Sequence, residues 1–279
     1  MQPEKTQKRT YKTPGSGRRV ITGVLLFVSC LLVLAGLLRD DSGGLRVAVK
    51  VTPTPTAMGT AFDETVVSRE ITVPARSWYA IQLGAFDSEE SAKSLAQSYL
   101  GRGAAGYVRK DGRFRVLAAL YKTRDEAASV RQQLQSQHGI DSYVYEITLP
   151  EIVLNVSGMA GQLDALEAGM QYLNTVLERF CDISVSMDRR DLVTEQELTV
   201  LAEVSSQAET LQNVIGLRFS TVQYAAVDDL RTLLETVKTS ADNVAEASKG
   251  GTVAMAAQMK YQTFFMLSGI EGYINSFGQ

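Results

Sequence analysis

The residue types that most often perform catalysis are sparse in this chain and are not grouped. His138 is the only histidine among 279 residues, and we expect it to favour the C-terminal end of a helix rather than to bind a metal. No Cys and His residues have the spacing of a zinc site, and no phosphate-binding G-x-x-x-x-G-K-[ST] motif is present. We therefore predict a protein that is not an enzyme and has no cofactor and no metal; nothing in the sequence supports a Ser-His-Asp arrangement.

A different chemistry is suggested by three polar residues in strand-like segments, Gln82, Arg113 and Arg115. An amide and two guanidinium groups offer several hydrogen bonds, which suit sugar hydroxyls, amides and lactyl carboxylates. The plainer alternative is that all three are ordinary solvated residues on an exposed face. The choice between the two depends on the elements that position these side chains.

The three residues lie in a segment, Trp78 to Glu146, that repeats itself with an offset of 35 positions. The matching positions include Tyr79 with Phe114, Ile81 with Val116, Phe86 with Tyr121 and Ala92 with Ala127. Each half reads as an alternating strand, a helix and a second strand, with capping boxes at Asp87 and Glu90 and at Thr123 and Glu126. Two such units predict a ferredoxin-like β-α-β-β-α-β domain over residues 76–149.

Both helices are expected to pack on one face of this sheet and to leave the other face open. Alternation assigns one set of side chains to the helices: Tyr79, Ile81, Leu83, Phe114, Val116 and Ala118. It places Gln82 beside Arg115 on the open face, with Arg113 nearby. By alternation alone these three residues are candidates for a binding surface, and the alternative of ordinary solvated residues stays open.

Two stretches resemble strands of SPOR domains: Trp78-Tyr79-Ala80-Ile81-Gln82-Leu83-Gly84-Ala85-Phe86 and Gly112-Arg113-Phe114-Arg115-Val116. Ala127 in the second helix fits too, and the resemblance covers about Ser77 to Ile147. SPOR domains bind peptidoglycan and prefer glycan strands stripped of stem peptides, which are enriched at division septa. The resemblance implies glycan contacts at Gln82 and Arg115, with Arg113 nearby. Two departures, Ala85 for a common serine and Ala119-Leu120-Tyr121 for Gly-Pro-Phe, bear on affinity more than on the fold.

RNA-binding modules of the RRM type share this topology, but they stack bases on aromatic side chains of the sheet. The outward positions of the third strand are Arg113, Arg115 and Leu117, without an aromatic pair. From Glu151 onward the chain has 17 acidic and 8 basic residues, which disfavours contact with phosphates. We therefore expect no nucleic-acid partner.

Residues 20–38 contain no charge, and nineteen helical residues span about 28 Å, close to the hydrocarbon core of a bilayer. Basic residues crowd the preceding segment, 1–19, so the positive-inside rule predicts a cytoplasmic tail, one transmembrane helix and extracytoplasmic domains. The expected location is the cytoplasmic membrane. A cleaved signal peptide normally has a shorter apolar stretch, and lipid modification of Cys30 is disfavoured because apolar residues continue after it.

Residues 39–75 are interpreted as an extracytoplasmic linker, with a Thr/Pro run at Thr52–Thr56.

In residues 150–279 apolar side chains recur at spacings of three and four in four segments, which predicts an antiparallel four-helix bundle. In the last segment Phe264 and Phe265 are adjacent and cannot both face one narrow seam. This leaves open a helix-mediated contact with another envelope or divisome protein.

The sequence therefore predicts an α+β chain made of one transmembrane helix, a SPOR-like domain and a helical bundle. We expect a membrane-anchored protein that binds denuded glycan strands and carries the bundle to sites of wall remodelling in division or sporulation. The main alternative is an envelope protein-interaction scaffold without significant glycan binding. A cryptic wall hydrolase is a third and weaker alternative.

Overall fold

The computed structural model describes residues 46–47, 66–189, 194–221 and 223–277. All of them lie within one compact unit, residues 41–279. The expected transmembrane segment, residues 20–38, and most of the expected linker lie outside the described residues. Within the described ranges, none of the helices has both the length and the hydropathy needed to cross a membrane.

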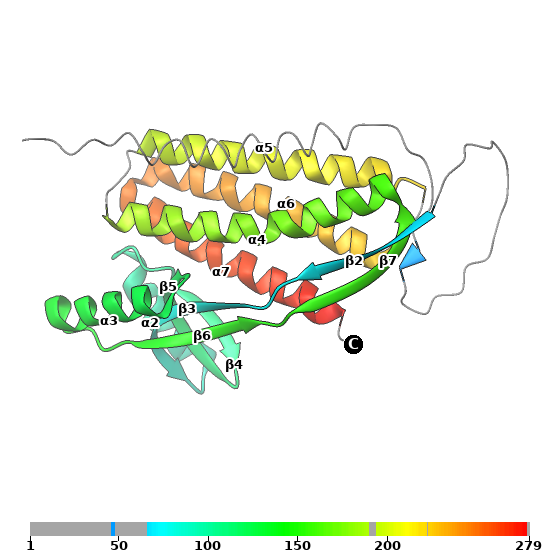
Figure 1. Ribbon diagram of the computed structural model, residues 1–279. Helices are drawn as coiled ribbons and strands as arrows, with labels where there is room; N and C mark the ends of the chain where they lie inside the picture. The colour runs from blue at the N-terminus through cyan, green and yellow to red at the C-terminus, as the bar shows by residue number, and fades with distance from the viewer. Residues whose placement is uncertain (1–45, 48–65, 190–193, 222, 278–279) are drawn as a thin grey trace, which may run out of the picture. The chain divides into compact units, whose positions relative to one another are not determined.

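A four-stranded antiparallel sheet carries two helices, as the internal repeat predicted. The elements follow in the order β3 (Arg76–Phe86), α2 (Glu89–Leu100), β4 (Tyr107–Asp111), β5 (Arg113–Tyr121), α3 (Arg124–His138) and β6 (Tyr143–Leu149). The strand order is β4-β5-β3-β6, so the strands that begin the two repeats are central neighbours (Figure 1). The predicted order of elements is confirmed.

The two helices begin in different ways. At α3 the predicted capping box is present: Oγ1 of Thr123 accepts from the backbone N–H of Glu126 at 3.2 Å, and Oε2 of Glu126 accepts from that of Thr123 at 3.3 Å. At α2 the predicted box of Asp87 and Glu90 was wrong, because Ser88 caps the helix. Serine is as good an N-cap as aspartate, so residue type alone did not decide between the two neighbours.

A second antiparallel ribbon joins the sheet to the helical region. β2 (Val66–Val73) pairs along its whole length with β7 (Ile152–Met159), and β1 (Arg46–Val47) pairs with the other edge of β7. Pro74 and Pro150 lie at the breaks between β2 and β3 and between β6 and β7, where a residue without a backbone N–H interrupts the ladder.

This ribbon corrects two expected boundaries. β2 falls within the range 39–75 that was interpreted as a linker, and β7 falls within the range 150–279 that was interpreted as helical. Ile71 and Val73 alternate with exposed residues and are buried. A lone strand is not stable in water, so the formation of β2 depends on a partner that lies far away in the sequence.

The C-terminal region is helical, as predicted. It consists of α4 (Ala160–Arg189), α5 (Thr194–Arg218), α6 (Ala225–Ala247), the short η1 (Ser248–Gly250) and α7 (Thr252–Ser276). The four long helices lie side by side (Figure 1), and each contacts its neighbours in the sequence, with α7 also packing on α4. Each of the four helices contributes buried apolar side chains, among them Phe180, Leu211, Leu234 and Phe264, each at most 1% exposed.

The sheet face opposite α2 and α3 was expected to be open, and most of it is covered. Both α4 and α7 contact β5, and Trp78, Leu117 and Leu120 on that face are at most 3% exposed. The ring of Tyr107 on β4 stacks on Phe264 of α7 with 5.3 Å between ring centres. The apolar run at the end of β5, from Val116 to Tyr121, is typical of a strand buried on both faces.

Candidate functional site

Gln82 and Arg115 meet at the end of the sheet face that the helices leave uncovered. Gln82 lies on β3 and Arg115 on the neighbouring β5, and Nη1 of Arg115 donates a hydrogen bond of 2.9 Å to Oε1 of Gln82. Alternation had placed these side chains on one face, and the structure brings them into direct contact. The amide oxygen of Gln82 therefore orients the guanidinium group.

Two residues that sequence reasoning missed complete this group. The Tyr145 hydroxyl on β6 donates a hydrogen bond of 2.5 Å to Oδ2 of Asp111, and Nε of Arg115 donates to the same oxygen at 3.3 Å. The guanidinium carbon of Arg115 lies 4.7 Å from the centre of the Tyr145 ring, which is a cation–π distance. We call Gln82, Asp111, Arg115 and Tyr145 the sheet-face cluster.

A signal for the aromatic part of this cluster was present in the sequence. Tyr143 and Tyr145 occupy alternate positions of β6, and they pair with Gln82 and Ala80 of β3. The alternation therefore places both rings on the same face as Arg115. Asp111 is the last residue of β4, next to the turn at Gly112, and turn residues of this kind carry no comparable signal.

Arg113 does not join the cluster. Its Nε donates a hydrogen bond of 2.9 Å to Oδ1 of Asp87, and both side chains are more than half exposed. An exposed ion pair of this kind contributes little to stability. The structure thus joins two of the three residues expected to form the binding surface and places the third in a separate pair.

Accessibility is lowest at Gln82 on the central strand β3 and is higher on the strands to either side, β5 and β6. Gln82 is 8% exposed, the side chain of Arg115 is 25% exposed, and Tyr143 beside them is 62% exposed. A ligand approaching this surface therefore meets the Tyr143 ring and the outer edge of the guanidinium group first. Gln82 is nearly buried, so its main contribution to this surface is to hold the Arg115 side chain in place.

Electrostatic interactions fix the protonation states of the cluster. The hydrogen bond from Tyr145 holds the pKa of the Asp111 carboxyl below its usual range, and the charge of Arg115 acts in the same direction. Burial raises the pKa of Tyr145, and its hydrogen bond to Asp111 adds to the effect. At neutral pH the cluster therefore holds a carboxylate, a guanidinium cation and a neutral phenol.

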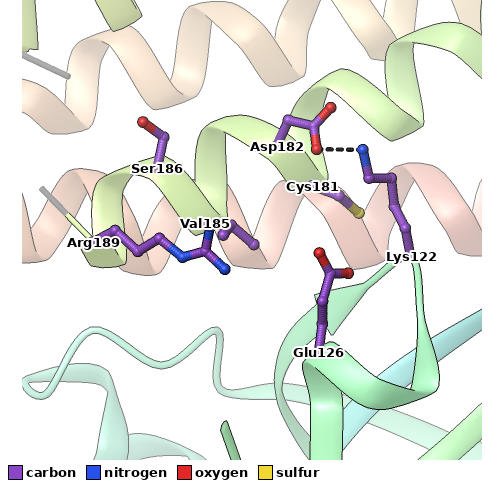
Figure 2. Close-up of a pocket in the computed structure, with 7 residues that line it drawn as sticks. All are labelled: Lys122, Glu126, Cys181, Asp182, Val185, Ser186 and Arg189. Carbon is purple, nitrogen blue, oxygen red and sulfur yellow. Dashed lines mark ion pairs between the residues drawn. The ribbon is translucent and has the colours of Figure 1, made fainter. Parts of the chain in front are cut away.

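A polar pocket lies elsewhere, between α4 and the start of α3 (Figure 2). Nζ of Lys122 pairs with Oδ1 of Asp182 at 2.5 Å, and Glu126 is engaged in the capping box of α3. Cys181 is buried and free, and burial raises the pKa of its thiol, which makes it a poor nucleophile. The part of the chain that the structure describes contains no group of acidic, His and Cys residues able to hold a metal ion.

The SPOR domain family model matches residues 75–146. The match covers β3, α2, β4, β5, α3 and the first part of β6, and it includes every residue of the sheet-face cluster. No curated protein and no solved structure matches the chain. A SPOR domain implies binding to peptidoglycan in cell division.

Proposed function

We propose that this chain is a membrane-anchored protein that binds peptidoglycan through the uncovered end of the sheet face and prefers denuded glycan strands. The observation that carries the proposal is the contact between Gln82 and Arg115 on the open end of a sheet that matches a SPOR domain. The resemblance of the two central strands to that family had implied glycan contacts at these two residues.

The chemistry of the cluster fits a glycan. A guanidinium group carries five N–H donors, and the contacts with Gln82 and Asp111 use Nη1 and Nε of Arg115, so the Nη2 donors remain for a ligand. Lactyl carboxylates of a denuded strand are good partners for such donors. The exposed ring of Tyr143 offers an apolar surface beside them.

The cover of helices limits how much glycan this face can contact. Because Trp78, Leu117 and Leu120 are buried beneath the helical region, the ligand is confined to the end of the sheet near Asp111 and Tyr143. A short stretch of sugar backbone fits this surface better than a long one. The proposed affinity is accordingly modest, and clustering of the protein on the wall would strengthen attachment.

The remaining parts of the proposal concern location and role. The uncharged stretch 20–38 after a basic segment supports anchoring in the cytoplasmic membrane with the domains outside. The helical region would then be carried to sites of wall remodelling in division or sporulation, where a further envelope or divisome protein is a candidate partner. We further propose that the chain binds without catalysing a reaction, which zymography on peptidoglycan gels can contradict.

Sedimentation with purified peptidoglycan tests the glycan site. Residues 41–279 should pellet with amidase-treated peptidoglycan and less with untreated material. Arg115→Ala removes a charged donor that contributes roughly 1.5–3 kcal/mol, so binding should weaken by at least tenfold. Arg124→Ala, an exposed arginine on α3, is the matched control and should bind as the unchanged protein does. If folded Arg115→Ala also pellets normally, the scaffold alternative becomes the better one.

A further inference from the structure

A cleft of about 530 Å³ lies on the other face of the sheet, between α2 and α3. Its apolar lining comes from both central strands and from α3, and includes Ile81, Leu83, Ala118, Ala119, Val130 and Leu134. The cleft is partly open to solvent, and its size lies in the range of ordinary ligand pockets.

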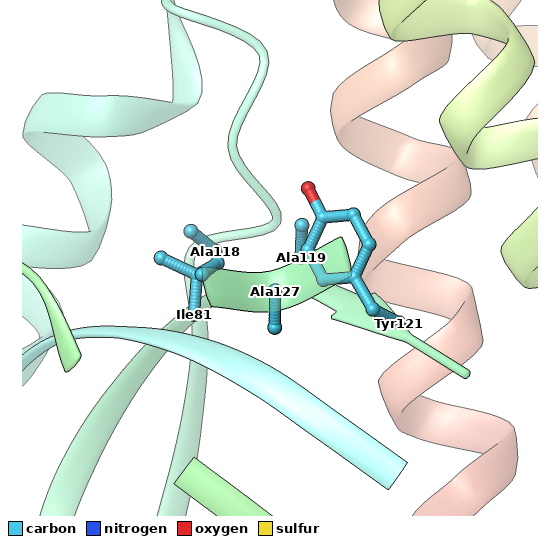
Figure 3. Close-up of a cluster of buried hydrophobic side chains, with 5 residues drawn as sticks. All are labelled: Ile81, Ala118, Ala119, Tyr121 and Ala127. Atoms are coloured by element: carbon cyan, nitrogen blue, oxygen red, sulfur yellow. The ribbon is translucent and has the colours of Figure 1, made fainter. Parts of the chain in front are cut away.

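Small side chains create the cleft. Figure 3 shows Ala118, Ala119 and Ala127 close to Ile81 and Tyr121 in the cluster that forms its floor. Within α2 and α3, the buried residues are Ala92 and Ala96 of α2 and Ala127 of α3. The buried contacts of the helices with the sheet are therefore made by alanines, with Leu95, Val130 and Leu134 only partly buried beside them. The two helices make few contacts with each other.

Helix α3 consequently has an apolar stripe that packs against the cluster of Ile81 and Tyr121 but is only partly covered by it. Val130 and Leu134, one turn apart, are only half-buried and line the cleft, together with Ile140 just after the helix. Apolar side chains at this spacing on an amphipathic helix normally face a packed core. Here part of each side chain faces the cleft, as in a ligand pocket lined mainly by apolar groups.

Two basic side chains, Arg102 and Lys260, and the imidazole of His138 are among the polar groups that line the cleft. Arg102 lies over the ring of Tyr99, with 5.1 Å from its guanidinium carbon to the ring centre, and His138 is at the end of α3. Lys260 of α7 is balanced by Asp188, whose Oδ1 accepts from its Nζ at 2.6 Å, and it also donates to the Gly103 carbonyl. Because the charges of Lys260 and Asp188 cancel, the interior of the cleft is mainly apolar. The net positive charge of the cleft lies near Arg102.

We propose that this cleft binds a single-chain amphiphile with an anionic head group. Its hydrocarbon chain lies over Ala118 and Ala119 against Val130 and Leu134, and its head group pairs with Arg102. The site is on the sheet face opposite the sheet-face cluster, so the inference does not rest on glycan binding. It gives the domain a second ligand, of a class that is abundant beside a membrane.

Calorimetric titration of residues 41–279 with octanoate, decanoate and dodecanoate, each below its micelle concentration, tests the proposal. One molecule should bind per chain, and affinity should rise about fourfold for each added methylene until the cleft is full. Dodecanol should bind more weakly than dodecanoate, and dodecyltrimethylammonium should bind most weakly. Equal affinity for the three head groups, or no saturable binding of any, would overturn the proposal.

Two variants locate the site. Ala118→Leu fills the floor of the cleft and should weaken dodecanoate binding at least tenfold, whereas Ala128→Leu on the exposed side of α3 should not. Arg102→Glu changes an exposed side chain and leaves the core intact. It should weaken dodecanoate and strengthen dodecyltrimethylammonium, while Arg124→Glu should change neither. Dodecanoate binding that ignores both Ala118→Leu and Arg102→Glu would contradict the assignment even if one molecule binds.

Discussion

Arg109 on β4 and Glu271 on α7 lie 162 positions apart in the sequence and share two hydrogen bonds of 2.7 and 2.8 Å. Their side chains are 18% and 24% exposed, and the hydrogen bonds to Glu271 raise the pKa of Arg109 despite the opposing effect of burial. This bidentate pair joins the edge of the sheet to the last helix beside the sheet-face cluster.

The pair predicts a measurable loss of stability on Glu271→Gln. The amide keeps the shape of the side chain but removes the charge from hydrogen bonds that contribute about 1.5–3 kcal/mol when charged. Chemical unfolding of residues 41–279 should report a loss in the lower part of that range. Glu246→Gln, which alters the exposed pair with Lys249, should change the free energy of unfolding by less than about 0.5 kcal/mol.

The adjacent residues Phe264 and Phe265 offer a matched test of how α7 packs. Phe264 is 1% exposed and stacks on Tyr107, whereas Phe265 is 48% exposed. Phe264→Ala should therefore cost about 3–5 kcal/mol, and Phe265→Ala less than about 1 kcal/mol. Thermal melts of the two variants measure the difference. Equal losses would mean that α7 does not pack on the sheet through Phe264.

The sequence was informative wherever local pattern decides the structure. The repeat of Tyr79 with Phe114 and of Ala92 with Ala127 predicted the order of strands and helices, and Thr123 with Glu126 predicted the start of α3. Period-two alternation also placed Gln82 beside Arg115. The faces of the strands and the start of the helix depend on neighbours within one strand or one helical turn, and the repeat supplied the topology that makes β3 and β5 neighbours.

Features that depend on distant contacts were missed. The cover of α7 over Leu117 and the pairing of β2 with β7 join segments far apart in the sequence, which a local pattern does not specify. Asp111 enters the cluster only because the β4–β5 turn brings it to Arg115 and Tyr145. Phe114, expected in the core, is only partly buried at the margin of the cluster formed by Ala92, Ala96 and Val116.

The acid sensitivity of the sheet-face cluster follows from Asp111. Its pKa is lowered from the ordinary value of 3.8 by the hydrogen bond from Tyr145 and then by Arg115. A lowered pKa means that the interaction is intact above about pH 3.8 and is lost as the pH falls through the lower folded-state value. Tyr145→Phe should raise the titration midpoint of the Asp111 carboxyl toward 3.8, as followed by carbonyl NMR. A midpoint that does not move would show that the phenol is not the partner.

Arg115→Lys separates the shape of the cation from its charge. The guanidinium donates to Gln82 through Nη1, to Asp111 through Nε, and lies over Tyr145. An ammonium group keeps the charge but has neither the planar fork nor the stacking surface. Arg115→Lys should therefore bind amidase-treated peptidoglycan more weakly than the unchanged protein and more strongly than Arg115→Ala. The melting temperatures of the two variants should differ little, because position 115 lies outside the apolar core. Full binding by Arg115→Lys would mean that charge alone attracts the glycan, and binding as weak as that of Arg115→Ala would mean that the fork supplies the whole effect.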